Sequence, residues 1–338
     1  MIQFKEVNKT YPGGVHAVRD LTLTVERGES LVLLGTSGSG KTTTMKMVNR
    51  LLEPTSGTIH VDGEDIMEQD PITLRRGIGY AIQHIGLFPH MSVGDNIAVV
   101  PNLLGWPTKR VVERTHELLE LVGLDPHAFT ERMPAQLSGG QRQRIGVARA
   151  LAADPDVILM DEPFGALDPI TREQLQDEFL ELEGMIQKTV IFVTHDVFEA
   201  IKMGDRVALM DDGRLQQIGT PGELVDNPAN QFVDDFLGQH RFQLALMTRN
   251  VGSIIDESKT EATTGSSLKI SARASLVDAL DSFKKSGENK ATVVQKQTPV
   301  GTLSKKHLLK AIAEVLGEAG GEDLVDKVDA ADKTHAEK

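Results

Sequence analysis

The stretch GTSGSGKTT, from Gly35 to Thr43, has the residue types and the spacing of a phosphate-binding loop. An apolar run, SLVLL, precedes it, and a helix-like run, TTTMKMVNRLL, follows it. Glycines let successive backbone N–H groups converge on phosphate oxygens, and the N-terminus of a helix adds positive potential. Lys41 could then reach the outer phosphates, and the Thr42 hydroxyl could ligate magnesium. The stretch therefore predicts a nucleotide site, although a plain strand-to-helix turn is the alternative.

The acidic pair Asp161 and Glu162 is a second feature that could do chemistry, because it follows the apolar run VILM. One carboxylate at the end of a strand can hold a magnesium ion, and a second can orient and polarise an attacking water molecule. Alone, such a pair could simply cap a helix. Together with the phosphate-binding loop, it indicates that Asp161 holds the metal and that Glu162 positions the water.

A third candidate is the stretch LSGGQ, from Leu137 to Gln141, which opens the helix-like run RQRIGVARAL. A serine and two glycines at a helix N-terminus can form an anion site. A helix N-cap without any ligand gives the same pattern, so the residues alone leave both readings open.

The elements that position these residues follow from the alternation of strand-like and helical runs, which predicts an α/β fold with a parallel sheet flanked by helices. The strand-like runs are SLVLLG, GIGYAIQ, DVILMDEP, TVIFVTHD and RVALMDDG. The phosphate-binding loop would lie at the carboxyl end of a strand, where such sheets bind ligands. Between about residues 86 and 153 the pattern is mostly helical, which predicts an inserted helical subdomain.

Composition narrows the possible functions of the chain. Its 338 residues suffice for two domains, and its net charge of −13 argues against a nucleic-acid binder. It has no cysteine, so disulfides and thiolate chemistry are excluded. No apolar run reaches the roughly 18 residues of a membrane span, and the first residues lack the apolar core of a signal peptide. We therefore expect the chain to stay in the cytosol.

In their order from Met1 to about Gly238, these motifs resemble those of the ATP-binding cassette (ABC) family. The resemblance implies a P-loop NTPase domain over residues 1–240 that binds ATP and Mg²⁺. It also implies that LSGGQ completes the ATP site of an opposing subunit. The nucleotide-binding residues would be Gly35, Thr36, Ser37, Gly38, Ser39, Gly40, Lys41, Thr42 and Thr43 of one chain, with Ser138, Gly139, Gly140 and Gln141 of the other.

The same resemblance assigns roles to four further residues. Tyr11 would stack on the adenine, and Asp168 would lie at the subunit interface. Gln83 would contact the magnesium ion and the attacking water, and it would link the site to a membrane partner. His195, after the run TVIFV, would contact the γ-phosphate. Magnesium would thus be held by Thr42, Gln83 and Asp161, and catalysis would depend on Glu162, His195 and Gln83.

These implied roles predict a homodimer in which two chains pair head to tail and enclose two ATP molecules. The stretches YAIQHIGLFPHMSVGDNI and DEPFGALDPITREQLQDEFLEL look most like the ATPases of glycine betaine, carnitine and choline importers. That likeness implies integral membrane permease subunits, an extracytoplasmic substrate-binding protein, and a place at the cytoplasmic face of the membrane. The alternatives are import of another small solute, such as an amino acid or polyamine, and a soluble ABC ATPase without transport.

The C-terminal part is predicted to be organised differently. Residues 241–267 read as a linker or a degenerate segment, and residues 318–338 as a disordered acidic tail. Residues 268–317 read helix, strand, strand, helix, and resemble a cystathionine-β-synthase-type (CBS) regulatory repeat. Repeats of this type that bind nucleotides commonly carry an aspartate where His307 stands, which argues against adenosine binding. A dimer-stabilising appendage without a sensing role is the alternative.

Overall fold

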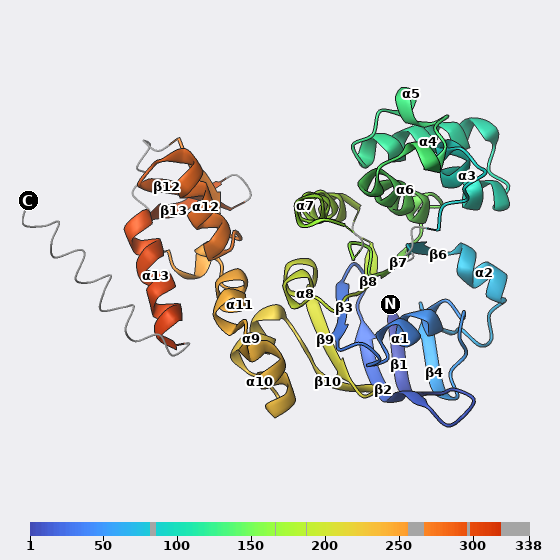
Figure 1. The fold of residues 1–338 in the computed structure, drawn as a ribbon, viewed down its shortest axis with the longest axis horizontal. Coiled ribbons are helices and arrows are strands. Elements are labelled where there is room, and N and C mark those ends of the chain that lie inside the picture. The colour runs from blue at the N-terminus through green and yellow to red at the C-terminus, as the bar shows by residue number, and fades with distance from the viewer. Residues whose placement is uncertain (82–85, 166, 187, 256–266, 296–297, 319–338) are drawn as a thin grey trace, which may run out of the picture. The chain divides into compact units, whose positions relative to one another are not determined.

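The computed structural model describes residues 1–81, 86–165, 167–186, 188–255, 267–295 and 298–318. The chain divides into two compact units, Met1–Thr220 and Pro221–Lys338 (Figure 1). The first unit therefore ends before residue 240, where the sequence places the end of the nucleotide-binding domain. The domain boundaries given above stay predictions, and each unit is described by itself.

An antiparallel sheet opens the first unit, with the strand order β2-β1-β4-β5. Its strands are β1 (Ile2–Thr10), β2 (His16–Val25), β4 (Ser56–Val61) and β5 (Glu64–Asp65). In the first half of β1, Ile2 and Phe4 are buried while Gln3 and Lys5 between and after them are exposed, as expected for a sheet with one covered face. The covered face packs against apolar residues of the central sheet and of helix α1 (Lys41–Val48), including Leu33, Ile191 and Met45.

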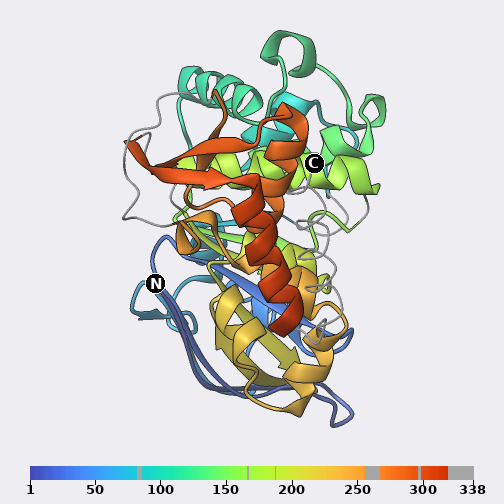
Figure 2. The same ribbon diagram turned by 90° about the vertical axis from the view of Figure 1, so that its left-hand side faces the viewer.

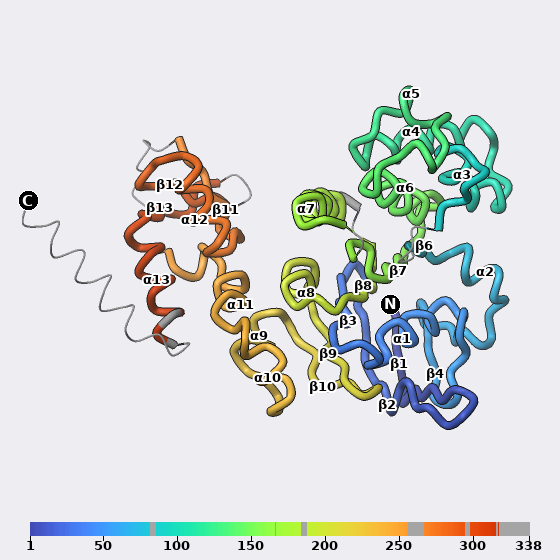
Figure 3. The backbone as a smooth tube through the Cα atoms, viewed as in Figure 1, coloured from blue at the N-terminus to red at the C-terminus, as the bar shows by residue number. Residues whose placement is uncertain are grey.

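The central sheet carries the functional loops, and its strand order is β10-β9-β3-β8-β7-β6 (Figure 3). Its strands are β3 (Ser30–Gly35), β6 (Ile78–Ala81), β7 (Val157–Asp161), β8 (Thr189–Val193), β9 (Arg206–Asp211) and β10 (Arg214–Gly219). All neighbouring pairs are parallel except β9 and β10. Every residue of β3, β7 and β8 is buried, which explains their continuous apolar runs.

Strand register brings three loops to one edge of this sheet. Val193 at the end of β8 pairs with Leu33 of β3 and with Asp161 of β7. Because these strands are parallel, the residues that follow each of them emerge side by side. The phosphate-binding loop, the acidic pair and the segment that contains His195 therefore meet at this edge.

Helices occupy the chain between the sixth and seventh strands of the first unit. They are α3 (Val93–Leu103), α4 (Thr108–Leu121), α5 (Pro126–Phe129), a 3₁₀ turn η1 (Pro134–Gln136) and α6 (Gly139–Leu151), and the short α2 (Pro71–Arg76) precedes β6. The side chains of Ser92, Asp125 and Ser138 accept hydrogen bonds from backbone N–H groups of the first turns of α3, α5 and α6. The limits of a separate helical subdomain stay a prediction.

Two more helices of the first unit follow functional loops. Helix α7 (Pro169–Ile186) begins after Asp168, and helix α8 (Val197–Met203) begins two residues after His195. The side chain of Asp196 caps α8 by accepting from the N–H groups of Phe198 and Glu199.

The second unit contains a small three-stranded sheet, which lies in the orange-to-red part of the chain in Figure 2. Its strand order is β11-β12-β13. The elements of the second unit are α9 (Pro221–Asp226), α10 (Gln231–Gly238), α11 (Arg241–Thr248), η2 (Val251–Ser253), β11 (Lys269–Ser271), α12 (Leu276–Ser286), β12 (Lys290–Gln295), β13 (Thr298–Ser304) and α13 (Lys305–Glu318). The order helix, strand, strand, helix predicted for the C-terminal module is present from α12 to α13.

The segment predicted to be a linker is partly helical. Helix α11 buries Leu244 and Ala245, and the following Val251 is fully buried. The N–H of Val251 donates to the carbonyl of Ala274, and α11 packs on both α12 and α13. Residues 241–255 therefore belong to the packed second unit, because α11 and Val251 bury apolar side chains in it. Residues 256–266 and the tail at 319–338 lie outside the described residues.

Candidate active site

The phosphate-binding loop connects the end of β3 to the start of α1, and its shape requires glycine at two positions. Gly35 has φ +151°, and a Cβ added to it would lie 2.1 Å from the carbonyl oxygen of Met210. Gly40 has φ +98°, and its added Cβ would lie 2.3 Å from the carbonyl oxygen of Ala17. Neither approach leaves room for a side chain. The loop is thus pressed against β9 and β2, which fix the direction of its N–H groups.

The Lys41 side chain is buried and folds back over the loop. Its Nζ donates to the carbonyl oxygens of Gly35 at 2.9 Å and Thr36 at 2.7 Å, and it lies 3.4 Å from the Ser39 hydroxyl. Burial lowers the pKa of Lys41, and the charges of the neighbouring acidic pair oppose that shift. These contacts hold a cation at the place where the outer phosphates of a nucleotide would lie.

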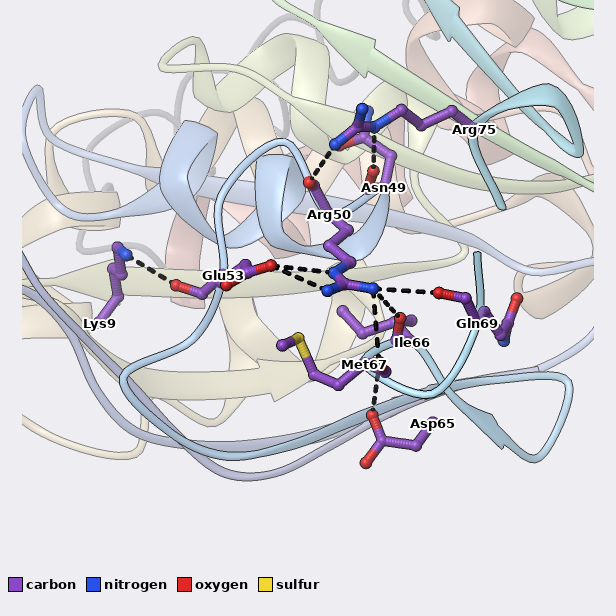
Figure 4. Close-up of polar contacts among 9 residues, drawn as sticks. All are labelled: Lys9, Asn49, Arg50, Glu53, Asp65, Ile66, Met67, Gln69 and Arg75. Carbon is purple, nitrogen blue, oxygen red and sulfur yellow. Dashed lines mark hydrogen bonds and ion pairs between the residues drawn. The ribbon is translucent and has the colours of Figure 1, made fainter. Parts of the chain in front are cut away.

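The far end of α1 is fixed by two arginines (Figure 4). The Arg75 guanidinium donates to the carbonyl oxygens of Asn49 at 3.2 Å and Arg50 at 2.6 Å. The Arg50 guanidinium donates to the Gln69 carbonyl at 3.0 Å and to a Glu53 carboxylate oxygen at 3.0 Å. Positive groups at a helix C-terminus stabilise its unpaired carbonyls. The helix that carries the phosphate loop is therefore tied to the segment that leads into β6.

A hydroxyl and a carboxylate converge at the start of α1. Thr42 Oγ1 donates to Asp161 Oδ1 at 3.0 Å, and Asp161 is buried at the end of β7. Burial raises the pKa of Asp161, whereas the hydrogen bond from Thr42 opposes the rise. Such an oxygen pair fits Mg²⁺, which takes one or two protein oxygens beside substrate phosphates. Gln83, the third predicted ligand, lies outside the described residues.

Glu162 and His195 face each other across the same edge of the sheet. The Glu162 carboxylate Oε1 lies 3.2 Å from Nδ1 of His195. Glu162 has φ +44°, and its N–H donates to the carbonyl of Val193 at 3.0 Å. A left-handed backbone at a non-glycine residue stores strain, and such residues concentrate at functional sites. This bend turns the half-buried Glu162 side chain out of the strand and toward the cleft.

These groups meet in a cleft of about 850 Å³, a volume in the range of small-molecule sites. Of the residues predicted from the sequence, those that line it are Tyr11, Ser37, Gly38, Gly40, Lys41, Thr42, Thr43, Glu162 and His195. The Tyr11 hydroxyl lies 3.3 Å from the Thr43 hydroxyl, so the ring stands next to the N-terminus of α1. The remaining loop residues and Asp161 lie beside this lining and support it through the contacts described above.

The sequence did not indicate one wall of the cleft. It is formed by Gly14, Val15, His16, Ala17, Arg19 and Asp212. Val15 is 63% exposed although it is apolar, and it lies close to Tyr11 along the chain. An aromatic ring and an apolar side chain suit the faces of a nucleobase. The two glycines of YPGGVH could have indicated a turn at this wall of the cleft. Asp212 could not have been found in this way, because it lies in the turn between β9 and β10, far away in the sequence.

The stretch Ser138–Gln141 is not among the described residues that line this cleft. Ser138 and Gln141 form a capping box, in which the Gln141 N–H donates to Ser138 Oγ at 3.2 Å and Gln141 Oε1 accepts from the Ser138 N–H at 3.0 Å. Asp168 likewise accepts from the Thr171 N–H at 3.1 Å and is exposed. One chain therefore does not bring the LSGGQ stretch and Asp168 to its own cleft. Their place in an opposing site stays a prediction.

The fold and the cleft together define a P-loop NTPase, in which a parallel sheet presents a glycine-rich loop, a cation and two carboxylates at one edge. A family model described as ABC transporter matches residues 18–165. The chain belongs to the ABC transporter family. The predicted α/β cassette fold and the predicted membership of this family are both confirmed, whereas the CBS-like identity of the C-terminal module stays a prediction.

Curated relatives agree with the subgroup that the sequence resembles. The chain is 56% identical over 241 residues to the glycine betaine/carnitine/choline transport ATP-binding protein OpuCA of Bacillus subtilis, covering 71% of this chain and 63% of that protein. It is 47% identical over 311 residues to the glycine betaine uptake system ATP-binding protein YehX of Escherichia coli, covering 91% and 99%. The chain thus matches less than two thirds of OpuCA and nearly all of YehX.

A solved structure supports the fold. It is described as a dimeric post-hydrolysis state of the ATP-binding cassette MJ0796 bound to ADP and Pi, with a TM-score of 0.59 and 33% identity. The match covers 65% of this chain and 98% of that chain. Within the described residues of the present chain, the helices are too short or too polar to cross a membrane.

Proposed function

We propose that this chain is the ATP-hydrolysing subunit of an importer for quaternary ammonium compounds such as glycine betaine, carnitine or choline. The observation that carries the proposal is the convergence of Lys41, Thr42, Glu162 and His195 in one cleft at the edge of the central sheet. The kind of cargo is supported by the names of OpuCA and YehX, because the residues of an ATP site do not depend on what is transported.

The chemistry of this proposal is assigned to the chain's own residues. The N–H groups of the loop and Lys41 would hold the phosphates of ATP, and Tyr11 would stack on the base. Thr42 and Asp161 would hold Mg²⁺, which when bound neutralises charge on the phosphates. Glu162 would accept a hydrogen bond from the attacking water and orient it, while His195 would donate to the γ-phosphate. The 3.2 Å contact between Glu162 Oε1 and His195 Nδ1 supports this pairing of roles, because it keeps the two side chains together in the cleft.

A homodimer is part of the proposal. Ser138 caps a helix N-terminus that is exposed and lies outside the chain's own cleft. The N-terminus of a helix attracts anions, so this end of α6 could contribute to the phosphate site of a second chain. Two chains related by a twofold axis would then exchange this contribution, and ATP would favour the closed pair.

A permease would dock through the segment GLFPHM after the sixth strand. Phe88 is 42% exposed in this segment, and its N–H donates to the side chain of Asn96 at 2.7 Å. The Asn96 amide, which is buried, donates in turn to the carbonyl of Met91 at 3.1 Å. A rigid loop that presents an aromatic side chain suits a cytoplasmic helix of an integral membrane protein. The chain would thus lie at the cytoplasmic face, below a permease served by an extracytoplasmic substrate-binding protein.

Two variants of the cleft test the proposal. Glu162→Gln should keep ATP binding and lose turnover by about 10²- to 10⁴-fold, because the amide cannot take a proton from water. It should also form a stable dimer in size-exclusion chromatography with ATP and Mg²⁺. Lys41→Ala should instead lose nucleotide affinity. A Glu162→Gln protein that stays monomeric and hydrolyses ATP at the parental rate would contradict the assignment.

A further inference from the structure

Helices α7 and α8 share a buried polar contact that the proposed mechanism does not use. Gln176 Nε2 of α7 donates to Glu199 Oε1 of α8 at 3.0 Å. Both residues are buried, with 7% of Gln176 and 6% of Glu199 exposed. Helix α7 begins just after Asp168, and α8 begins just after His195. The contact therefore joins the two helices that follow two functional loops.

Ion pairs flank this contact on both sides. Arg172 lies 3.8 Å from Asp196 at the start of the two helices. Lys202 lies 2.6 Å from Asp177 farther along them. Asp196, Glu199 and Lys202 are three residues apart, so these three partners lie along one face of α8. The outer pairs are partly exposed and contribute little, whereas the buried contact has no competing water.

Glu199 also contacts the segment that contains His195. Its backbone N–H donates to Asp196 Oδ1 at 3.2 Å, and Asp196 directly follows His195. The N–H of Asp196 donates in turn to the hydroxyl of Thr194 at 3.0 Å, and Thr194 is only 2% exposed. Burial raises the pKa of Glu199, and the neighbouring Thr194 hydroxyl and Gln176 amide oppose the rise. Glu199 thus contacts α7 through its carboxylate and the residue next to His195 through its backbone N–H.

A buried carboxylate is a costly way to join two helices, because desolvation opposes its charge. Apolar side chains of similar size would pack the same space without that cost. The hydrogen bond that the carboxylate accepts has a preferred geometry, so it fixes the angle and the register between α7 and α8. This arrangement is suited to transmitting a displacement of α7 to the loop that holds His195.

We propose that Glu199 is a positioning residue that, through Gln176 and Asp196, couples the Asp168 end of α7 to the position of His195. Formation of the closed dimer at Asp168 would thereby act on the imidazole, whose Nδ1 already lies 3.2 Å from Glu162 Oε1 in the single chain. The inference rests on the proposed role of His195 in ATP hydrolysis. The coupling depends on the hydrogen bond from the Gln176 amide to the Glu199 carboxylate. Exchanging the two side chains would reverse the donor and the acceptor and keep the bond.

The exchange is the test. Gln176→Glu places two carboxylates face to face, and the double variant Gln176→Glu/Glu199→Gln restores one amide and one carboxylate. Glu178→Gln is the matched control, because Glu178 lies on the same helix but contacts Arg144 of α6 at 2.6 Å. The readouts are kcat, KM for ATP and the midpoint of thermal unfolding. If Gln176→Glu does not fold, Gln176→Met removes the same donor without adding charge.

Gln176→Glu should lower kcat by about 10- to 100-fold, the loss expected when a reacting group is displaced by about an ångström. KM should stay near the parental value, the double variant should recover most of kcat, and Glu178→Gln should resemble the parent. In a His195→Ala background, Gln176→Glu should cause no further loss, because its effect passes through His195.

Two outcomes would overturn the role of the pair. The first is an unchanged kcat in both Gln176→Glu and Gln176→Met, while Glu162→Gln abolishes hydrolysis. The second is an equal loss in the parental and His195→Ala backgrounds. Either result would leave the proposed function standing. A parent protein that does not hydrolyse ATP would instead refute the proposed function, and with it the role of the pair.

Discussion

Substituting alanine at Gly38 separates two demands on the phosphate loop: its backbone conformation and the space kept free for the nucleotide. Gly38 has φ +82°, and a Cβ added to it meets no atom within 4 Å. Gly63, in the turn between β4 and β5, has φ +85° and equally open surroundings. The difference between them is that Gly38 lines the cleft, whereas Gly63 is not among its lining residues. Gly63→Ala is therefore a reference for backbone strain alone.

The two variants should lose the same stability and differ in binding. A left-handed conformation costs a residue with a Cβ about 1–2 kcal/mol, so each should lower the free energy of unfolding by that amount. In Gly38→Ala the new methyl group would also occupy the place of a phosphate oxygen. Losing one hydrogen bond to a charged oxygen costs about 1.5–3 kcal/mol, which corresponds to roughly 10- to 150-fold weaker ATP binding.

Denaturant unfolding of the nucleotide-free proteins and calorimetric titration with ATP and Mg²⁺ measure these two quantities. We expect equal unfolding free energies for Gly38→Ala and Gly63→Ala, and parental ATP affinity for Gly63→Ala alone. Equal ATP affinity in the two variants would refute the reasoning, because it would mean that no phosphate approaches the loop at Gly38.

Three further predictions concern other parts of the first unit. Gly40→Ala should lose more unfolding free energy than Gly63→Ala in the same denaturant assay, because a carbonyl lies 2.3 Å from its new Cβ. Burial and the charge of Asp205 raise the pKa of Glu183 to about 7. The folded protein then binds more protons than the unfolded chain between about pH 4.5 and 7, so stability falls as pH rises through that window. Glu183→Gln should therefore add about 1–2 kcal/mol at pH 8 and clearly less at pH 5, and an equal effect at both pH values would contradict the shift. Ser138→Arg and Lys41→Ala chains should recover part of their ATPase activity when mixed, since one site of each heterodimer is intact; no recovery in proven heterodimers would count against shared sites.

The centre of the site was predictable because it depends on local sequence. Apolar runs mark β3, β7 and β8, and parallel strands end at a common edge, so Lys41 and Glu162 were expected to meet there, whereas the role of His195 came from the family resemblance. The types of residue that follow each strand then define the chemistry. None of this needed knowledge of loop conformations.

The parts that were not predicted depend on packing between distant segments. Arg19 joins the cleft because its N–H donates to the carbonyl of Gly213 at 2.8 Å, a contact that no local pattern encodes. The strain at Glu162 likewise follows from its hydrogen bond to Val193 and not from its own type. Residues 241–267 read as a linker or a degenerate segment from their sequence, whereas α11 within them packs on α9, α12 and α13, which no local pattern encodes.

Uptake of radiolabelled glycine betaine and choline tests the central claim most directly. The measurement uses cells that lack every other importer of these solutes and in which this chain is deleted and then restored as the parent or as Glu162→Gln. The parent should restore uptake, and Glu162→Gln should not, although both proteins accumulate to the same level. Equal uptake with the two proteins, or uptake that survives the deletion, would contradict the claim that ATP hydrolysis in this cleft drives import.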